Sequence, residues 1–211
     1  MADGDFAAMR AAMVASQLRT SDVNDPAVIA AMAQVPREEF VPAARRDTAY
    51  TDRSIPLGGG AAMNPPLATG RLLNAAGIQP GDKVLLLGDA TGYTAALLTH
   101  IGASVTAVGS GQKPATLPGS VKWVDGAPAK GCKSSGPYDV ILIDGAVAEF
   151  PDALTGQLAE KGRAVAGMSE RGVTRLCSGR KAGGFVGFVR LADMEMADAI
   201  GFEPAPAGFT F

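Results

Sequence analysis

The sequence is poor in the residue types that build metal centres and nucleophilic catalytic pairs. It contains one histidine, His100, and two cysteines, Cys132 and Cys177, which lie in separate segments without the spacing of a metal site. A zinc site, a Ser/His pair or a Cys/His pair needs several such side chains close together. The composition therefore argues against these chemistries and predicts that the protein binds no metal.

Long apolar runs and clusters of positive charge are also missing. No apolar stretch approaches the roughly twenty residues that cross a bilayer. The first five residues carry Asp3 and Asp5, where a secretory signal carries Lys or Arg. The net charge is -2, the pI is near 5.4, and the basic residues are dispersed. We therefore expect a cytoplasmic protein with no nucleic-acid partner and no membrane partner.

The composition itself is that of a globular chain. Hydrophobic residues make up 47% of the 211 residues and charged residues 19%, which is enough apolar material for one well-formed core. We expect a single domain over residues 1–211. Within it, residues 1–77 form a helical N-terminal part and residues 78–211 an α/β part.

Hydrophobic spacing gives the order of helices and strands. Apolar residues three and four apart predict helices, and short continuous apolar runs between glycines predict buried parallel strands. The expected helices are 6–18, 26–35, 67–76, 91–101 and 152–159, and the expected strands are 83–87, 105–108, 121–124, 138–143, 163–167, 173–177 and 185–191. This alternation predicts an α/β fold with a mainly parallel sheet, flanking helices and an antiparallel hairpin at the C-terminal end.

A glycine-rich loop, Gly88-Asp89-Ala90-Thr91-Gly92, lies between the first strand of the α/β part and its helix. Ligands of open α/β sheets bind at this edge, and a helix N-terminus offers free N–H groups to an anion. Alternatively, the glycines serve only the packing of helix on strand. A dinucleotide is disfavoured, because Ala90 replaces a required glycine and Gly109 stands where an acid would hold the ribose.

Seven segments, in order, resemble the protein-L-isoaspartate O-methyltransferase family. The most recognisable is residues 30–42, whose AM-x-x-VPR-x-x-FVP pattern is a signature of that family. The others are residues 13–19, 49–52, 84–98, 124–126, 137–141 and 162–163. The resemblance implies a Rossmann-like methyltransferase fold, with S-adenosylmethionine as cofactor and a protein or peptide as substrate. It also implies methyl transfer to the carboxylate of L-isoaspartyl residues in damaged proteins, which is a repair reaction.

The substrate loop departs from the family pattern. That pattern reads Gly-Gln-Thr-Ile-Ser-x-Pro, whereas residues 60–66 here read Gly-Ala-Ala-Met-Asn-Pro-Pro. Ala62 and Asn64 therefore replace the two hydroxyl residues that the family places at the reacting carboxylate. The catalytic position at Ala62 is vacant, and Asn64 is the candidate that orients the substrate oxygen through its amide N–H.

The cofactor segment also departs from the pattern. Leu86 and Gly109 replace family acids, and Ala90 replaces a family glycine. Asp89 could take over the role of the acid missing at Leu86 by pairing with the ligand's ammonium group, or it could only cap the helix. The predicted cofactor-binding residues are Gly88, Asp89, Ala90, Gly92, Asp125, Gly126 and Asp144.

Asp125 and Asp144 carry two open interpretations. Asp125 is expected near the adenine and Asp144 near the methyl donor, but each could equally do no more than end a strand. Two functions follow for the chain as a whole. One is the methyltransferase. The other is a non-catalytic homologue with the same fold that acts as a protein-binding or nucleotide-binding module.

Overall fold

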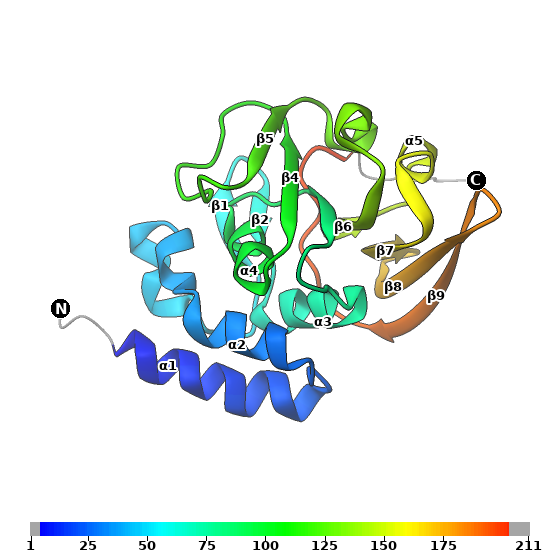
Figure 1. The fold of residues 1–211 in the computed structure, drawn as a ribbon. Helices are drawn as coiled ribbons and strands as arrows, with labels where there is room; N and C mark the ends of the chain where they lie inside the picture. The colour runs from blue at the N-terminus through cyan, green and yellow to red at the C-terminus, as the bar shows by residue number, and fades with distance from the viewer. Residues whose placement is uncertain (1–4, 203–211) are drawn as a thin grey trace, which may run out of the picture.

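A computed structural model describes residues 5–202. A seven-stranded sheet forms its centre, with strand order β5-β4-β3-β6-β7-β8-β9 (Figure 1). The strands from β5 to β7 are parallel, and β8 and β9 are added antiparallel at one edge. The strands are β3 (Lys83–Leu87), β4 (Ser104–Gly109), β5 (Lys122–Asp125), β6 (Tyr138–Val147), β7 (Leu158–Glu170), β8 (Val173–Ala182) and β9 (Phe185–Asp193).

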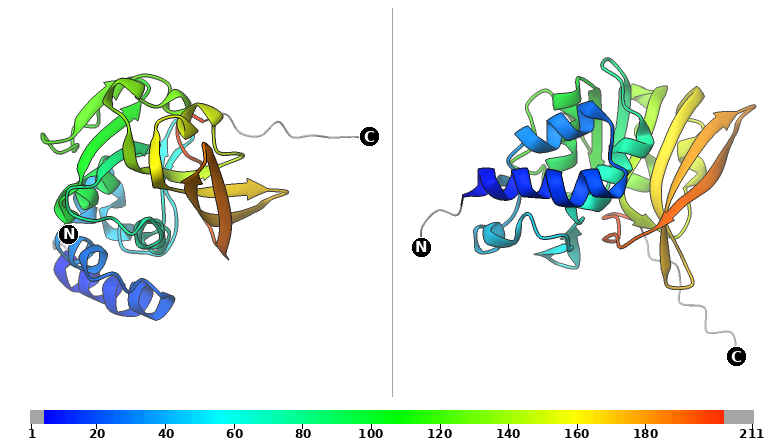
Figure 2. Two further views of the ribbon diagram at one scale, coloured as in Figure 1. Left: turned by 45° about the vertical axis from the view of Figure 1, so that its right-hand side comes forward. Right: turned by 90° about the horizontal axis from the view of Figure 1, so that it is seen from below.

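Four helices of the described residues, α1 to α4, pack together on one face of the sheet. Helices α3 and α4 lie directly on the strands, α2 packs on both of them, and α1 packs on α2 (Figures 1 and 2). A separate two-stranded hairpin, β1 (Ile55–Gly58) with β2 (Ala61–Met63), carries the substrate loop. The helices are α1 (Phe6–Met13), which continues as a π-helical turn to Leu18, α2 (Pro26–Gln34), α3 (Pro66–Ala76), α4 (Tyr93–Ile101) and α5 (Asp152–Thr155).

Local chemistry sets where these helices begin and end. The Asp25 carboxylate accepts hydrogen bonds from the N–H groups of Ala27 and Val28, and Pro26 occupies the first turn of α2. Such a cap satisfies donors that the helix itself leaves free. Helix α3 ends at Gly77, which adopts the left-handed conformation that favours glycine.

The central strands are buried on both faces, which explains their continuous apolar sequences. Val84 and Leu86 of β3 belong to the core on the side of α3 and α4. Leu85 and Leu87 belong to the second core, which also includes Cys132 beside the short 3₁₀ turns and Leu154 of α5. The predicted fold class is confirmed: an α/β fold with a mainly parallel sheet and an antiparallel C-terminal hairpin.

One predicted helix is wrong beyond its first turn. Residues 152–159 were expected to be helical, but α5 ends at Thr155 and strand β7 begins at Leu158. Leu158 is buried in the second core and pairs with Tyr138 of β6, so sheet formation overrides local helix propensity. Strand β7 has 13 residues and contains the predicted strand 163–167.

The segment after β9, residues 194–202, returns to the middle of the sheet. The N–H of Ala146 donates to the carbonyl of Ala197 at 2.8 Å, and the N–H of Ala199 donates to the carbonyl of Ala146 at 2.9 Å. This C-terminal segment, red in Figure 1, therefore crosses the sheet beside the carboxyl end of β6. Over residues 5–202, no helix is both long enough and apolar enough to cross a membrane.

Restoring the family acid at position 86 is expected to damage the fold. Leu86 is fully buried among apolar side chains. Leu86→Glu therefore places a carboxylate in the apolar core. Urea unfolding should show a loss of about 3 kcal/mol or more in the free energy of unfolding. The matched control Leu86→Met should lose less than about 1.5 kcal/mol. A Leu86→Glu protein as stable as the control would contradict this packing.

Candidate active site

The glycine loop needs glycine at two positions. Gly88 and Gly92 have φ angles of +80° and +83°, which side chains rarely adopt. A Cβ atom at Gly88 would lie 3.2 Å from Cβ of Ala199, and one at Gly92 would lie 3.1 Å from Cα of Leu117. The loop is therefore held close to the C-terminal segment on one side and to residue 117 on the other.

The Asp89 carboxylate caps helix α4. It accepts hydrogen bonds from the backbone N–H groups of Gly92 at 2.7 Å, Ala95 at 2.9 Å and Thr91 at 3.1 Å. Burial raises the pKa of Asp89, and these three N–H donors oppose that rise. These three hydrogen bonds agree with the interpretation that Asp89 caps the helix. A further contact to a ligand's ammonium group stays a proposal.

Asp144 joins parts of the chain that are distant in sequence. Its Oδ1 accepts from Nδ2 of Asn64 at 2.8 Å, and its Oδ2 accepts from the hydroxyl of Thr94 at 2.7 Å. Burial, followed by the charge of Asp89, raises the pKa of Asp144 to about 6. Two neighbouring, partly buried carboxylates make a site that a cationic ligand group would neutralise.

Asn64 is held at both ends of its side chain. While Nδ2 donates to Asp144, Oδ1 accepts from the N–H of Ala197 at 2.8 Å, and the side chain is only 3% exposed. Asn64 therefore connects the substrate loop to both the sheet and the C-terminal segment. Ala62 lies two residues earlier on β2, is partly buried, and brings no polar group to the loop.

Arg37, which was not among the predicted site residues, fixes the backbone of Asn64. It is completely buried, donates to the carbonyl oxygens of Ala49 and Asn64, and lies 5.0 Å from the ring centre of Tyr93. Burial lowers the pKa of Arg37, and nearby groups that include Asp144 oppose this. The signal in the sequence was the place of Arg37 inside the family signature of residues 30–42.

A small cleft of about 100 Å³ borders the glycine loop. Gly88, Asp89 and Ala90 line it, whereas the predicted residues Gly92, Asp125, Gly126 and Asp144 are not among its lining residues. The other lining residues are Val108, Gly109, Ser110, Gln112, Pro114, Trp123 and Ile200.

Asp125 and Gly126 stabilise the loop at the carboxyl end of the neighbouring strands. Asp125 is exposed at the end of β5, and its carboxylate accepts from the N–H of Gly111 at 3.0 Å. The N–H of Gly126 donates to the carbonyl of Gly109 at 3.0 Å. Both residues lie at the predicted edge of the sheet, next to the cleft-lining residue Gly109.

Sequence comparisons place the chain among known proteins. The family model described as Protein-L-isoaspartate(D-aspartate) O-methyltransferase (PCMT) matches residues 9–118 and 112–189. The protein-L-isoaspartate O-methyltransferase of Koribacter versatilis is 37% identical over 95% of this chain and 96% of its own length. Protein-L-isoaspartate O-methyltransferase 1 of Rhodopseudomonas palustris is 35% identical over 94% and 85%. The chain belongs to the protein-L-isoaspartate O-methyltransferase family.

Two solved structures have a similar fold. A protein-L-isoaspartate O-methyltransferase matches with a TM-score of 0.76 and 22% identity, over 90% of this chain and 65% of that one. A second, from Plasmodium falciparum and solved with S-adenosyl-L-homocysteine, has a TM-score of 0.72 and 18% identity, over 90% and 97%. At such identities these matches support the methyltransferase fold, which the sequence predicted.

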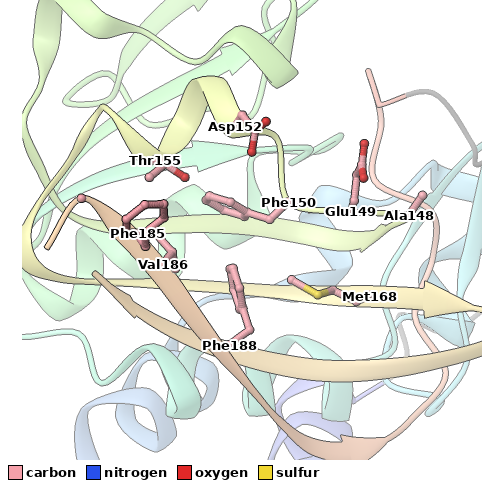
Figure 3. Close-up of a pocket in the computed structure, with 10 residues that line it drawn as sticks. Ala148, Glu149, Phe150, Asp152, Thr155, Met168, Phe185, Val186 and Phe188 are labelled. Carbon is pink, nitrogen blue, oxygen red and sulfur yellow. The ribbon is translucent and has the colours of Figure 1, made fainter. Parts of the chain in front are cut away.

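A larger hollow lies elsewhere on this methyltransferase fold. It has a volume of about 650 Å³ and opens between α5 and the β7–β9 strands (Figure 3). Phe150, Phe185 and Phe188 line it, together with Glu149 and Asp152. None of the predicted site residues lines this hollow. The glycine loop borders the smaller cleft instead, and Asp144 contacts the substrate loop through Asn64.

The raised pKa of Asp144 makes stability depend on pH. Between its ordinary pKa of 3.8 and the folded value of about 6, the folded protein keeps a proton that the unfolded chain has lost. Stability therefore falls as pH rises through this window. Asp144→Asn should remove this loss, and at about pH 8 it should be more stable than wild type by on the order of 1–3 kcal/mol.

Urea unfolding at several pH values measures this difference, which should shrink towards zero near pH 4. The control is Asp47→Asn, because Asp47 is exposed. A difference between Asp144→Asn and wild type that stays constant with pH would show that Asp144 does not titrate as described.

Proposed function

We propose that this chain transfers a methyl group from S-adenosylmethionine to the carboxylate of L-isoaspartyl residues in damaged proteins. Membership of the family supports the reaction class. The single observation that carries the proposal is the Asp144 junction, because one carboxylate joins Asn64 of the substrate loop to Thr94 of the helix that follows the glycine loop. Substrate-side and cofactor-side elements thus meet at one point.

The residues at this point suit the chemistry of the cofactor. When bound there, S-adenosylmethionine supplies a methyl group on a positively charged sulfur, and it also carries an ammonium group. Asp89 and Asp144 would hold these positive charges. Their carboxylates are partly buried and close enough for the charge of Asp89 to raise the pKa of Asp144. Gly88 and Ala90 of the loop add no large side chain to the wall of the adjoining cleft.

The protein's own part in the reaction is mostly positioning. An isoaspartyl carboxylate is ionised at neutral pH, so it needs no general base. Asn64 and Arg37 fix the substrate loop, because Arg37 donates to the backbone carbonyl of Asn64. The C-terminal segment donates the Ala197 N–H to the side-chain oxygen of Asn64 and so fixes the other end of this side chain.

Other features of the proposal follow from the same contacts. Residues 1–77 and 78–211 act as one domain, since the bond from Asn64 to Asp144 joins the two parts; residues 1–4 and 203–211 lie outside the described residues. The partner is a protein or peptide that carries the isoaspartyl group. A cytoplasmic location fits the two free thiols, Cys132 and Cys177. The family membership favours this enzyme over a non-catalytic binding module.

The test is transfer of labelled methyl to an isoaspartyl peptide, with the aspartyl isomer as control substrate. Wild type should label only the isoaspartyl peptide. Asn64→Ala cuts the bonds to Asp144 and Ala197 and should lower kcat/KM by roughly one to three powers of ten, as at other preorganised sites.

Asp47→Asn, an exposed change, should leave the rate unchanged. Wild-type protein that binds S-adenosylhomocysteine but labels neither peptide would instead assign the chain to the binding modules.

A further inference from the structure

Glycine at position 109 is matched to the tryptophan on the neighbouring strand. A Cβ atom added to Gly109 would lie 2.4 Å from Cη2 of Trp123, and 3.2 Å from both Cζ2 and Cζ3. Carbon atoms ordinarily meet at about 3.5–4.0 Å, so the edge of the indole occupies the space of a side chain at position 109. A carboxylate cannot stand there while Trp123 keeps this position.

The same indole forms part of the wall of the cleft beside the glycine loop. Trp123 lines this cleft together with the apolar residues Val108, Pro114 and Ile200. Asp89 is the one acid among the described lining residues, and its carboxylate already accepts from three backbone N–H groups. The cleft therefore offers an aromatic and apolar surface, and no free carboxylate for ribose hydroxyls.

We propose that Trp123 binds the adenosine part of the cofactor by stacking, in place of the carboxylate that the family has at position 109. The inference rests on the proposed function, because that function supplies the ligand. An aromatic ring offers a surface to the flat face of a base, whereas a carboxylate binds the ribose hydroxyls. Gly109 is part of the same arrangement, since only glycine leaves room for the indole.

The two modes of binding give similar affinity but different selectivity. Stacking of a base on an aromatic side chain changes affinity roughly 5- to 150-fold, and a charge-assisted hydrogen bond changes it roughly 10- to 150-fold. Exchanging one for the other can keep the cofactor bound. The ribose hydroxyls, however, lose a carboxylate acceptor at position 109, so the protein should discriminate less between a 2′-hydroxyl group and a hydrogen atom.

The first experiment measures binding of S-adenosylhomocysteine by calorimetry to wild type, Trp123→Leu and Trp123→Phe. Trp123→Leu should raise Kd roughly 5- to 150-fold, and Trp123→Phe, which keeps an aromatic face, less than about fivefold. Trp123 is the one tryptophan of the sequence, so its fluorescence in wild type should change saturably with the ligand.

The matched control is Phe185→Leu, an aromatic-to-aliphatic change at an 81% exposed residue of β9, and it should leave Kd unchanged. Trp123→Leu that binds as tightly as wild type, or more tightly, overturns the role of Trp123. The proposed function survives in that case, because wild type still binds and transfers methyl. Absence of binding by wild type and Trp123→Leu alike overturns both.

A second experiment compares S-adenosylhomocysteine with its 2′-deoxy analogue. Wild type should bind the two within about threefold. The double variant Gly109→Glu with Trp123→Val exchanges the indole for a carboxylate and should prefer the hydroxyl-bearing ligand by about tenfold or more. A tenfold preference already present in wild type would show that another group binds the ribose, and would overturn the proposal.

Discussion

The carboxylate of Asp144 holds together the elements on which the site depends. It accepts one hydrogen bond from the substrate loop and one from helix α4, at 2.8 and 2.7 Å. Asn64 extends this connection to the C-terminal segment, and buried Arg37 fixes the backbone of Asn64. Asp89 lies close enough to raise the pKa of Asp144, so two partly buried acidic groups lie together at this junction. The hydrogen bonds and the negative charge of the site therefore coincide at Asp144.

The departures from the family pattern are consistent with the packing around them. Leu86 replaces an acid and fills the apolar core below α3 and α4. Gly109 replaces another acid, and the indole of Trp123 occupies the space that becomes free. At both positions, apolar atoms of this chain occupy the place of the charged side chain in the family pattern. Leu86 packs in the core, whereas the exchange at Gly109 changes which chemical groups line the cleft.

Sequence reasoning predicted the fold well because buried parallel strands leave a clear signal, as in residues 83–87 and 138–143. It missed the end of α5, where Leu158 has apolar neighbours in the sequence but a strand partner in space. The glycine loop was predictable from its position after a strand. The bond from Asn64 to Asp144 was not, since 80 residues separate the pair. Trp123 and the C-terminal segment act through neighbours on other strands, which no local pattern reveals.

Carbon NMR of the Asp144 carboxyl group, followed from about pH 3 to pH 8, tests the central role of this junction most directly. Free protein should give a titration midpoint near the raised pKa of about 6. Addition of S-adenosylhomocysteine, which carries an ammonium group, should lower that midpoint, because a nearby positive charge favours the ionised form. A midpoint at the ordinary value of 3.8 that the ligand leaves unchanged would contradict the account.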